Sequence, residues 1–314
     1  MTSYTLVLRN YPTSYALVVR TSAWNGKRIF LIIGDKLSTL YVVATPIGNL
    51  GDISQRAIEV LSTVDVIAAE DTRHTGKLLS EFSISSKLIA LHDHNEDRST
   101  ARIIQMLEDG QNIAMVSDAG TPLISDPGYH LVNQCLSKGI DVVAVPGPSS
   151  VTAALSIAGM PTNRFSFEGF VPAKTLARRE FLTNLKFETR TQVFFESPHR
   201  INETLRAMAE IMGPGRQLSL CRELTKTFEQ VVLASVGELS KRIGSGDIPS
   251  KGEFVLVLRG SDESLAVNAD HLLQTLLAEL SPSKAASVAA KVTDLSKSDL
   301  YNRALVLKKG ADPA

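Results

Sequence analysis

Residues 116–128, with the sequence VSDAGTPLISDPG, bring together side chains that could bind a small polar ligand. Two carboxylates, Asp118 and Asp126, and two hydroxyls, Ser117 and Thr121, lie among small residues that let a ligand approach the backbone. An apolar run precedes this stretch and a helical pattern follows it, and open α/β sheets bind ligands after the carboxyl ends of their strands. Such oxygens suit the hydroxyls of a ribose or the head group of an amino acid. Taken alone, the stretch is equally consistent with an ordinary turn.

Four more polar loops follow apolar runs in the first half of the chain. The first of them, PIGNLGD at residues 46–52, has neither the GxGxxG pattern of dinucleotide-binding folds nor the GK[ST] of a P-loop. Pro46 also removes one backbone donor from this loop. Loops without a cationic anchor for phosphate suit S-adenosylmethionine, which offers a carboxylate, a ribose and an adenine. The other three loops are EDTRH at 70–74, HDHNE at 92–96 and PGPSS at 146–150.

His92 and His94 would point the same way on an extended segment and could suggest a metal site. No third ligand stands at a recognisable spacing from them, so a hydrogen-bonding or structural role is favoured. We therefore expect no metal centre. The sequence also has no Gly-x-Ser-x-Gly elbow or Cys/His pair that would argue for covalent catalysis.

Acids and bases follow the apolar runs of the second half of the chain, where they could form a basic, hydroxyl-rich rim. Basic side chains there could hold phosphates, which position a nucleic acid without reading its sequence. The alternative is a set of surface ion pairs, and for the adjacent Arg178 and Arg179 alone that is the better interpretation. The members of this group are Lys174, Arg178, Arg179, Glu196, Ser197, His199, Arg200, Arg222, Glu223, Lys226 and Glu229.

Two sheets are needed to position these loops. Between residues 40 and 158, five apolar runs alternate with helical patterns, which predicts parallel βαβ units whose polar loops gather at one sheet edge. We expect Asp52 to cap the helix over 53–61 and Gly110 to end the helix over 99–109. In the second half, strands follow one another with fewer helices, which predicts a mixed sheet.

The two ends of the chain differ from its middle. The first 34 residues contain four basic residues and no acidic one, which is typical of a transit peptide and equally of a poorly ordered extension. We leave residues 1–38 out of the predicted fold. Beyond a linker, leucines at helical spacing and two further short helical patterns predict a small helix-turn-helix-like module over residues 270–310.

Composition restricts the classes of partner. Lys and Arg together number 33, as do Asp and Glu, so the net charge is zero and any polyanion must be met by a local patch. Cys135 and Cys221 fall in apolar patterns far apart in the chain, which indicates reduced core thiols of a cytoplasmic protein. No apolar run approaches the length of a membrane span, so we expect no membrane partner.

The motifs, taken in chain order, carry a resemblance to one family. They are TPIGNLGDIS (45–54), AAEDTRHTGKLL (68–79), LHDHNE (91–96), SDAGTPLISDPG (117–128), PGPSS (146–150), FEGFVPAK (167–174), FESPHR (195–200), CRELTKTFE (221–229) and KGEFVLV (251–257). From about residue 40 to residue 260, the chain resembles the ribosomal RNA small-subunit methyltransferase I family of tetrapyrrole-methylase-like (class III) enzymes. That family uses S-adenosylmethionine to methylate the 2′-hydroxyl of a decoding-centre cytidine in 16S rRNA. Residues 1–38 depart from the family.

The resemblance implies a two-domain α/β fold of the tetrapyrrole-methylase type. A parallel-sheet domain would span residues 39–160, a mixed-sheet domain residues 161–261, and the C-terminal helical module would follow. The family also implies a homodimer and a cofactor bound between the two α/β domains. The cofactor contacts it implies are Pro46, Asp118, Ala119, Gly120, Thr121, Ser149, Ser150, Glu168, Gly169, Phe170 and Gly252.

The mechanism follows from the chemistry of the methyl donor. Alignment of the ribose 2′-oxygen with an activated methyl group supplies much of the acceleration, and a general base adds roughly 10²–10⁴-fold. Our hypothesis gives the base role to Glu196 or His199. Basic residues would hold phosphates of the 16S rRNA in the small ribosomal subunit, namely Arg200, Arg222 and Lys226 together with Lys174, Arg178 and Arg179 along the rim. The alternatives are a tetrapyrrole methylase of the same fold and a non-catalytic RNA- or ribosome-binding module.

Overall fold

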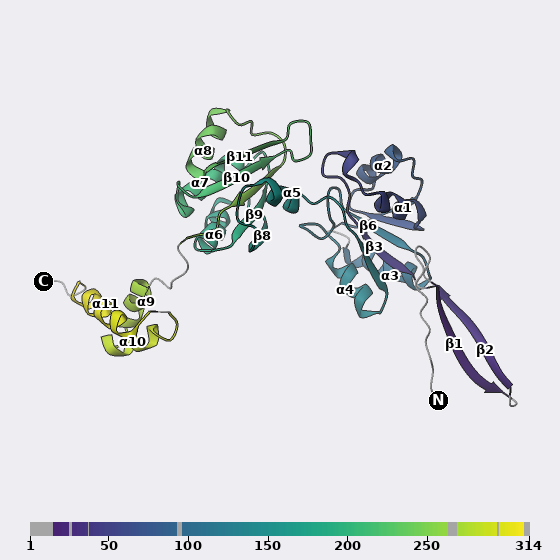
Figure 1. The fold of residues 1–314 in the computed structure, drawn as a ribbon, viewed down its shortest axis with the longest axis horizontal. Helices are drawn as coiled ribbons and strands as arrows, with labels where there is room; N and C mark the ends of the chain where they lie inside the picture. The colour runs from purple at the N-terminus through teal and green to yellow at the C-terminus, as the bar shows by residue number, and fades with distance from the viewer. Residues whose placement is uncertain are drawn as a thin grey trace. The chain divides into compact units, whose positions relative to one another are not determined.

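The computed structural model describes residues 15–24, 27–36, 38–92, 96–262, 269–293 and 295–310. The chain has an α/β fold with a parallel five-stranded sheet, a mixed five-stranded sheet and a group of C-terminal helices, as predicted (Figure 1).

The first sheet has the strand order β5-β4-β6-β3-β7. Every pairing within it is parallel, so the carboxyl ends of its strands meet at one edge. The strands are β3 (Thr39–Val43), β4 (Val66–Ala69), β5 (Lys87–Ala90), β6 (Ile113–Val116) and β7 (Asp141–Val145). The helices that alternate with them are α1 (Gln55–Thr63), α2 (Thr72–Glu81), α3 (Glu96–Glu108), α4 (Tyr129–Ser137) and α5 (Ser150–Ile157).

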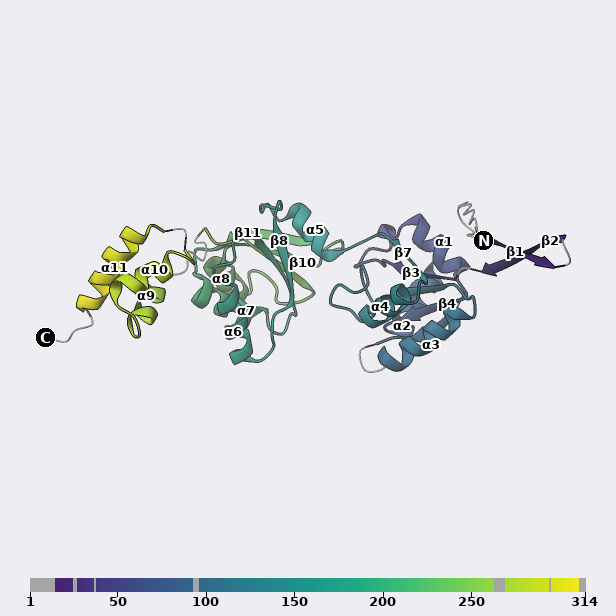
Figure 2. The same ribbon diagram turned by 90° about the horizontal axis from the view of Figure 1, so that it is seen from below.

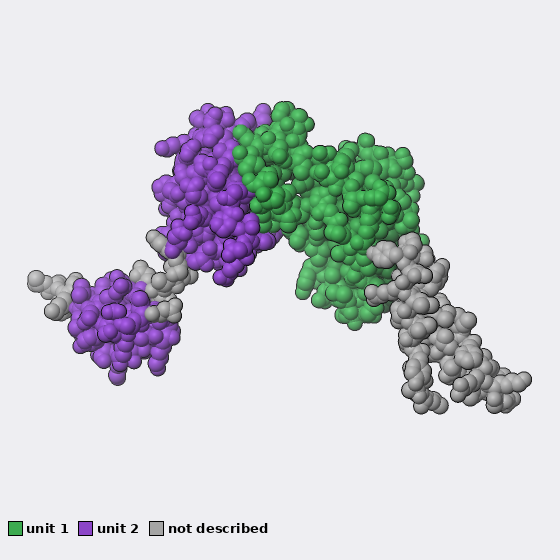
Figure 3. Space-filling model, in the orientation of Figure 1, with its two compact units in different colours: residues 1–157, 221–231, 252–255 green, residues 158–220, 232–251, 256–314 purple. Residues whose placement is uncertain are grey.

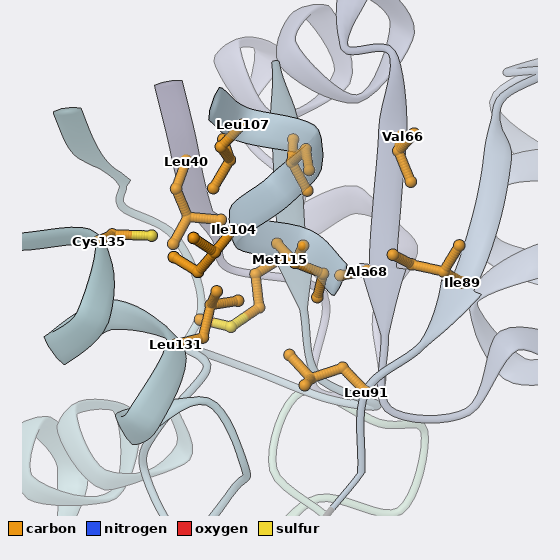
Figure 4. Packing of buried hydrophobic residues seen from close by; sticks show 12 residues of the cluster. Leu40, Val66, Ala68, Ile89, Leu91, Ile104, Leu107, Met115, Leu131 and Cys135 are labelled. Carbon is orange, nitrogen blue, oxygen red and sulfur yellow. The ribbon is translucent and has the colours of Figure 1, made fainter. Parts of the chain in front are cut away.

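Alternate residues of these strands face opposite layers of helices. Val66 and Ala68 pack in one apolar cluster with α3 and α4, whereas Ile67 and Ala69 pack in another with α1 and α2. Figure 1 shows the two helix pairs on opposite faces of the sheet. This is the two-residue period of a strand, and burial on both faces explains why the strands are continuously apolar. Figure 4 shows Met115 of β6 in the middle of the first cluster.

The start of α1 corrects one expectation. Ser54, and not Asp52, is the N-cap, and its side chain accepts a hydrogen bond from Ala57 N at 3.1 Å. Asp52 lies in a short 3₁₀ helix, η1 (Leu50–Asp52), which is capped by the side chain of Asn49. Both residues are good N-caps, and the extra turn in the loop moves the helix start past the first of them. Gly110 follows α3 with a φ of 84°, as expected for the residue after a helix.

The second sheet has the order β11-β10-β12-β9-β8, and β8 and β9 run parallel. Its strands are β8 (Phe165–Phe170), β9 (Thr191–Glu196), β10 (Gln217–Arg222), β11 (Gln230–Ser235) and β12 (Phe254–Leu258). The helices of this part are α6 (Thr175–Leu185), α7 (Ile201–Met212) and α8 (Val236–Ser245).

The chain divides into two compact units after Ile157 (Figure 3). Residues 221–231 and 252–255, which the sequence analysis assigned to the second domain, belong to the first unit. The local reason is visible at Gly48, whose Cα lies directly against the side chain of Lys226.

Three helices form the C-terminal module, α9 (Ala269–Leu277), α10 (Pro282–Ala289) and α11 (Lys297–Gly310), grouped together in Figure 2. They share a small core of their own, built mostly from alanines, which let helices approach closely. Its buried members are Ala269, Leu273, Ala285, Ala286, Ala289, Leu300 and Ala304.

The N-terminal segment holds two strands that the sequence analysis left unassigned. β1 (Tyr15–Trp24) and β2 (Lys27–Lys36) pair antiparallel along their whole length. Residues 1–14 lie outside the described part of the chain. No helix among the described residues is long and apolar enough to cross a membrane.

Candidate functional site

Loops from several strand ends of the first sheet are bonded to one another. Thr45, after β3, forms an isolated bridge with Gly120, after β6, with N···O distances of 2.8 and 3.1 Å. The Thr45 hydroxyl also donates to Ser117 O at 3.3 Å. Thr121 Oγ1 donates to Pro148 O, after β7, at 3.0 Å. The edge predicted from the parallel pattern is therefore one hydrogen-bonded loop cluster.

Asp118 joins this cluster to the loop that follows β4. Its Oδ1 accepts a hydrogen bond from Asp71 N at 3.0 Å, and its own N–H donates to Glu70 Oε2 at 3.2 Å. Asp71 is in turn the N-cap of α2, where its carboxylate accepts from the backbone and side chain of Arg73. The side-chain hydrogen bond from Arg73 is the main reason why the pKa of Asp71 is far below its ordinary value.

The loop over 117–128 has an unusual backbone. Gly120 and Gly128 have φ values of 87° and 121°, and Leu123 and Ser125, which are not glycines, have 72° and 68°. Left-handed conformations of this kind cost on the order of 1–3 kcal/mol for L residues and collect at ligand sites. A Cβ on Gly120 would lie 3.2 Å from Ile47 Cγ2, which is a tight contact, and the positive φ of Gly120 also disfavours any other residue at this position.

A small ligand would find unused polar capacity here. The buried hydroxyl of Ser117 has no hydrogen-bond partner among the described residues. Such an unpaired group is costly unless something else bonds to it. Asp118 and Thr121 nearby are half-buried and Ala119 is exposed, so a ligand can reach all three. Three further residues that the resemblance implied are half-buried: Pro46 and Ser149 lie in neighbouring strand-end loops, and Ser150 begins α5.

Lys226 lies in the same unit, in the loop between β10 and β11. Its ammonium is 3.0 Å from Glu223 Oε1 and 3.0 Å from Glu253 Oε2. Burial lowers the pKa of Lys226, but the hydrogen bonds to the two carboxylates outweigh it, so the net pKa is raised. Burial raises the pKa of Glu223, but the hydrogen bonds from the Glu253 N–H and from Lys226 outweigh it, so the net pKa is lowered. Arg222 Nη1 donates to Phe228 O at 3.3 Å.

Glu196 ends β9 in the second unit and is buried. Its carboxylate accepts hydrogen bonds from Ser197 N at 2.7 Å, Arg200 Nε at 3.0 Å and the Thr204 hydroxyl. Arg200 is the N-cap residue of α7, so its hydrogen bond to the Glu196 carboxylate fixes the start of this helix. His199 lies beside them and is exposed. The geometry favours a positioning role for Glu196 and leaves His199 as the group that a substrate can reach.

The two adjacent arginines of α6 form ion pairs with α7. Arg178 is buried, with Nη2 at 2.7 Å from Glu203 Oε2, and Arg179 pairs with Glu210. A buried guanidinium cannot contact RNA, so the prediction that Arg178 binds RNA is not supported, whereas the ion-pair interpretation is. Lys174, just before α6, is exposed.

The end of β8 carries the second-unit residues that the resemblance implied for the cofactor. Glu168, Gly169 and Phe170 lie in the strand itself, next to a register shift between Phe167 and Gly169. Gly169 has a φ of 69°, and Phe170 is exposed and packs edge-on against Phe195 at 5.3 Å between ring centroids. Gly252 lies in the first unit, beside Glu223.

Three residues of the first unit take part in the site although they are not among the contacts predicted from the sequence. Glu70 and Asp71 bond to Asp118, and Glu253 bonds to Lys226, across separations of 48, 47 and 27 residues. The available signal was the position of Glu70 and Asp71 directly after an apolar run and of Glu253 directly before one. It could not identify partners, because pairing across strands depends on the sheet order.

Comparisons with known proteins agree with this architecture. The family model of the tetrapyrrole (corrin/porphyrin) methylases matches residues 39–240, and the model of the RsmI C-terminal HTH domain matches residues 263–308. Among solved structures, uroporphyrin-III-C-methyltransferase from Thermus thermophilus superposes with a TM-score of 0.51 at 21% identity, over 70% of this chain and 94% of that one. Diphthine synthase superposes with a TM-score of 0.54 at 15% identity, over 71% of this chain and 90% of that one. At these identities the likeness concerns the fold.

Curated relatives are much closer in sequence. A protein named ribosomal RNA small subunit methyltransferase I from Escherichia coli O157:H7 is 51% identical over 85% of this chain and 94% of its own length. Proteins of the same name from Vibrio cholerae and Pseudomonas aeruginosa are 51% and 48% identical, over 83% and 85% of this chain and 92% and 96% of their own lengths. The N-terminal segment lies outside the family models.

Proposed function

Because this chain belongs to the tetrapyrrole methylase family, we propose that it transfers a methyl group from S-adenosylmethionine to the ribose 2′-hydroxyl of a decoding-centre cytidine in 16S rRNA. The family supports the reaction class, and the relatives named ribosomal RNA small subunit methyltransferase I support the substrate. The single structural observation that carries the proposal is the bonded loop cluster of Thr45, Asp118, Gly120 and Thr121 at one sheet edge.

The residues of this cluster fit the methyl donor. Ser117 offers an unpaired buried hydroxyl, Asp118 a carboxylate, and Gly120 a stretch of backbone without a Cβ. We assign the cofactor contacts in this unit to the residues that the resemblance indicated there, and Glu168, Gly169 and Phe170 remain contacts that the resemblance implies. The first-unit contacts are Pro46, Asp118, Ala119, Gly120, Thr121, Ser149, Ser150 and Gly252.

The bound donor supplies a methyl group that its sulfonium already activates, so the chain must orient the acceptor and handle one proton. We assign proton acceptance from the 2′-hydroxyl to His199, because it is exposed and imidazole is the commonest general base. Glu196 then acts through Arg200, which it holds at the start of α7. Lys174, Arg179, Arg200 and Arg222 are the proposed phosphate contacts, while Arg178 holds α6 against α7.

The assembly and its location follow from the same proposal. The partner is the small ribosomal subunit, where the rRNA resides, and the compartment is the cytoplasm. A homodimer is supported by large apolar side chains that are exposed in the second unit, among them Phe165, Leu176 and Leu233. Light scattering on the purified protein at micromolar concentration would give twice the monomer mass, and the mass of a monomer would contradict this part.

Calorimetric titration with S-adenosylmethionine tests the cofactor assignment. We expect Asp118→Asn to weaken binding by about tenfold or more, since it removes a charged acceptor that also orders the loop. Asp141→Asn is the matched control, because Asp141 begins β7 at the opposite edge of the same sheet. Equal affinities of both variants and the unmodified protein would contradict the site.

His199→Ala tests the base in the same protein. We expect turnover on small subunits to fall by about 10²-fold or more while cofactor affinity stays unchanged. Turnover within twofold of the unmodified enzyme would show that another group accepts the proton.

A further inference from the structure

The loop that carries Lys226 is held in a strained conformation. Glu223 and Thr225, neither of them glycine, have φ values of 51° and 63°. The Lys226 N–H donates to Glu223 O at 3.0 Å, and the Thr225 N–H donates to the side-chain carboxylate oxygen Oε2 of Glu229 at 2.6 Å, so both bonds close the loop. Such conformations persist only where the surroundings over-determine them, which points to a function for the loop.

Gly252 leaves space for the side chain of Glu223. A Cβ at Gly252 would lie 2.5 Å from Glu223 Cγ and Cδ, and the φ of Gly252 is 90°. The neighbouring Glu253 N–H donates to Glu223 Oε1 at 2.9 Å, and that same oxygen faces the Lys226 ammonium. The carboxylate is therefore fixed from two sides.

Gly48 leaves space for the aliphatic part of the Lys226 side chain, called its stem below. A Cβ at Gly48 would overlap Cγ of Lys226, so the lysine stem lies across the bare Cα of this residue. Gly48 belongs to the loop after β3, which also contains Pro46. The stem of Lys226 thus packs on a loop assigned to the cofactor, while its head is held by carboxylates.

The charge balance argues against a phosphate contact for Lys226. Its single positive charge faces two carboxylates, at 3.0 Å from each. Both carboxylates hold the ammonium directly, and each of them would repel a phosphate that approached it. The sequence-based expectation that Lys226 holds RNA is therefore at odds with its surroundings.

We propose that Lys226 is a positioning residue, clamped by Glu223 and Glu253, whose stem fixes the loop after β3 in the form that receives the cofactor. Gly48 and Gly252 are the residues that make room for this clamp. The inference rests on the proposed function, because it requires that loop to bind S-adenosylmethionine. It assigns Lys226 an effect on cofactor affinity and none on the affinity for RNA.

Lys226→Met tests the proposal, because it removes the ammonium and keeps a stem of similar length. Cofactor affinity would be measured by calorimetry without RNA, and affinity for small ribosomal subunits by filter binding without cofactor. We expect the cofactor dissociation constant to rise about tenfold, the RNA affinity to stay within twofold, and Lys226→Arg to restore part of the cofactor affinity. The matched control is Lys138→Met, which breaks the exposed pair with Glu108 in the same unit.

Two results would overturn the inference. Unchanged cofactor affinity in Lys226→Met shows that the clamp does not support the loop, and a selective loss of RNA affinity shows a direct phosphate contact. If the unmodified protein bound no S-adenosylmethionine at all, the proposed function would fail first. The control titration of the unmodified protein separates that case from failure of the clamp alone.

A double-mutant cycle checks the contact with Gly48 in protein whose folding is confirmed by circular dichroism. Gly48→Ala should weaken cofactor binding in the presence of the lysine and do so by a smaller factor when Lys226→Ala has removed the stem. We expect a coupling of about fivefold or more between the two sites. Independent effects of the two substitutions would show that the stem does not act through Gly48.

Discussion

Glu196 and His199 show how burial decides what a side chain at a strand end can do. They lie three residues apart in one motif, and the sequence offers both as general bases. The Glu196 carboxylate is buried and accepts three hydrogen bonds, whereas the His199 ring is exposed. A fully engaged carboxylate orients its neighbours, and an exposed imidazole can meet a substrate. Sequence pattern alone cannot separate these cases, because both residues follow the same apolar run.

The buried thiol of Cys135 leads to a prediction about how the stability of the protein depends on pH. The thiol is buried between β6 and α4, and burial raises its pKa to about 11 from an ordinary value of 9.0. A raised folded-state pKa means that the thiol's contribution to stability is fully present below pH 9 and is lost as the pH rises toward 11. We expect the urea midpoint of the unmodified protein to fall over this range by more than that of Cys135→Ala. Parallel pH profiles of the two proteins would contradict the buried thiol.

Helix starts show where local rules succeed and where they shift by a few residues. Asn49, Asp52 and Ser54 are all good N-cap residues within six positions. The short helix η1 takes the first of them and places Asp52 in its last turn, so α1 begins after Ser54. Propensity identifies the set of possible caps, and the path of the loop selects among them.

Ser54→Ala therefore has a specific expected cost. Loss of the cap to Ala57 N should lower the free energy of unfolding by about 1 kcal/mol. Asp52→Ala is the control and should change it by less than about 0.5 kcal/mol, as surface substitutions usually do. Urea denaturation followed by circular dichroism measures both. If Asp52→Ala lowered the free energy of unfolding more than Ser54→Ala, Asp52 would be the N-cap of α1, as the sequence suggested.

Substitution of Gly128 tests how the loop over 117–128 packs against the first apolar cluster. A Cβ there would lie 2.6 Å from Sδ of Met115, whose side chain is buried within the first cluster (Figure 4). Gly139 is a matched control, since its φ is also positive but nothing lies within 4 Å of a Cβ. We expect Gly139→Ala to cost about 1 kcal/mol and Gly128→Ala to cost about 1–3 kcal/mol more, because overpacking is added to the strain. Equal costs would show that the core can yield at Met115.

The predictable part of the molecule is the part fixed by local pattern. The alternation of apolar runs and helical patterns predicts the parallel first sheet, and the helices expected over 53–61 and 99–109 are present at Gln55–Thr63 and Glu96–Glu108. The parallel sheet then places Asp118 and Thr121 at one edge. What the pattern could not supply is long-range pairing, as between Lys226 and Glu253 or between Arg178 and Glu203. Those contacts depend on the order of strands in the sheet and on helix packing, and a short stretch of sequence holds no information about either.

The whole chain combines two α/β units with a helical module that has its own core. Its formal net charge is zero, so no long-range field draws it to a polyanion. The proposed recognition of RNA therefore relies on local basic groups such as Lys174 and Arg179, and we expect binding to weaken as salt rises, in proportion to the few phosphates contacted. Segments from distant parts of the sequence meet in the first unit, where residues 221–231 and 252–255 join the first 157.

Methylation of small ribosomal subunits that lack their native methylation tests the central claim most directly. The purified protein would be incubated with them and with S-adenosylmethionine labelled in the methyl group, and the RNA digested to nucleosides. We predict that the label appears in 2′-O-methylcytidine with the unmodified protein and falls steeply with Asp118→Asn and His199→Ala. Label in no nucleoside, despite intact cofactor binding, would contradict the account and point to a small acceptor such as a tetrapyrrole.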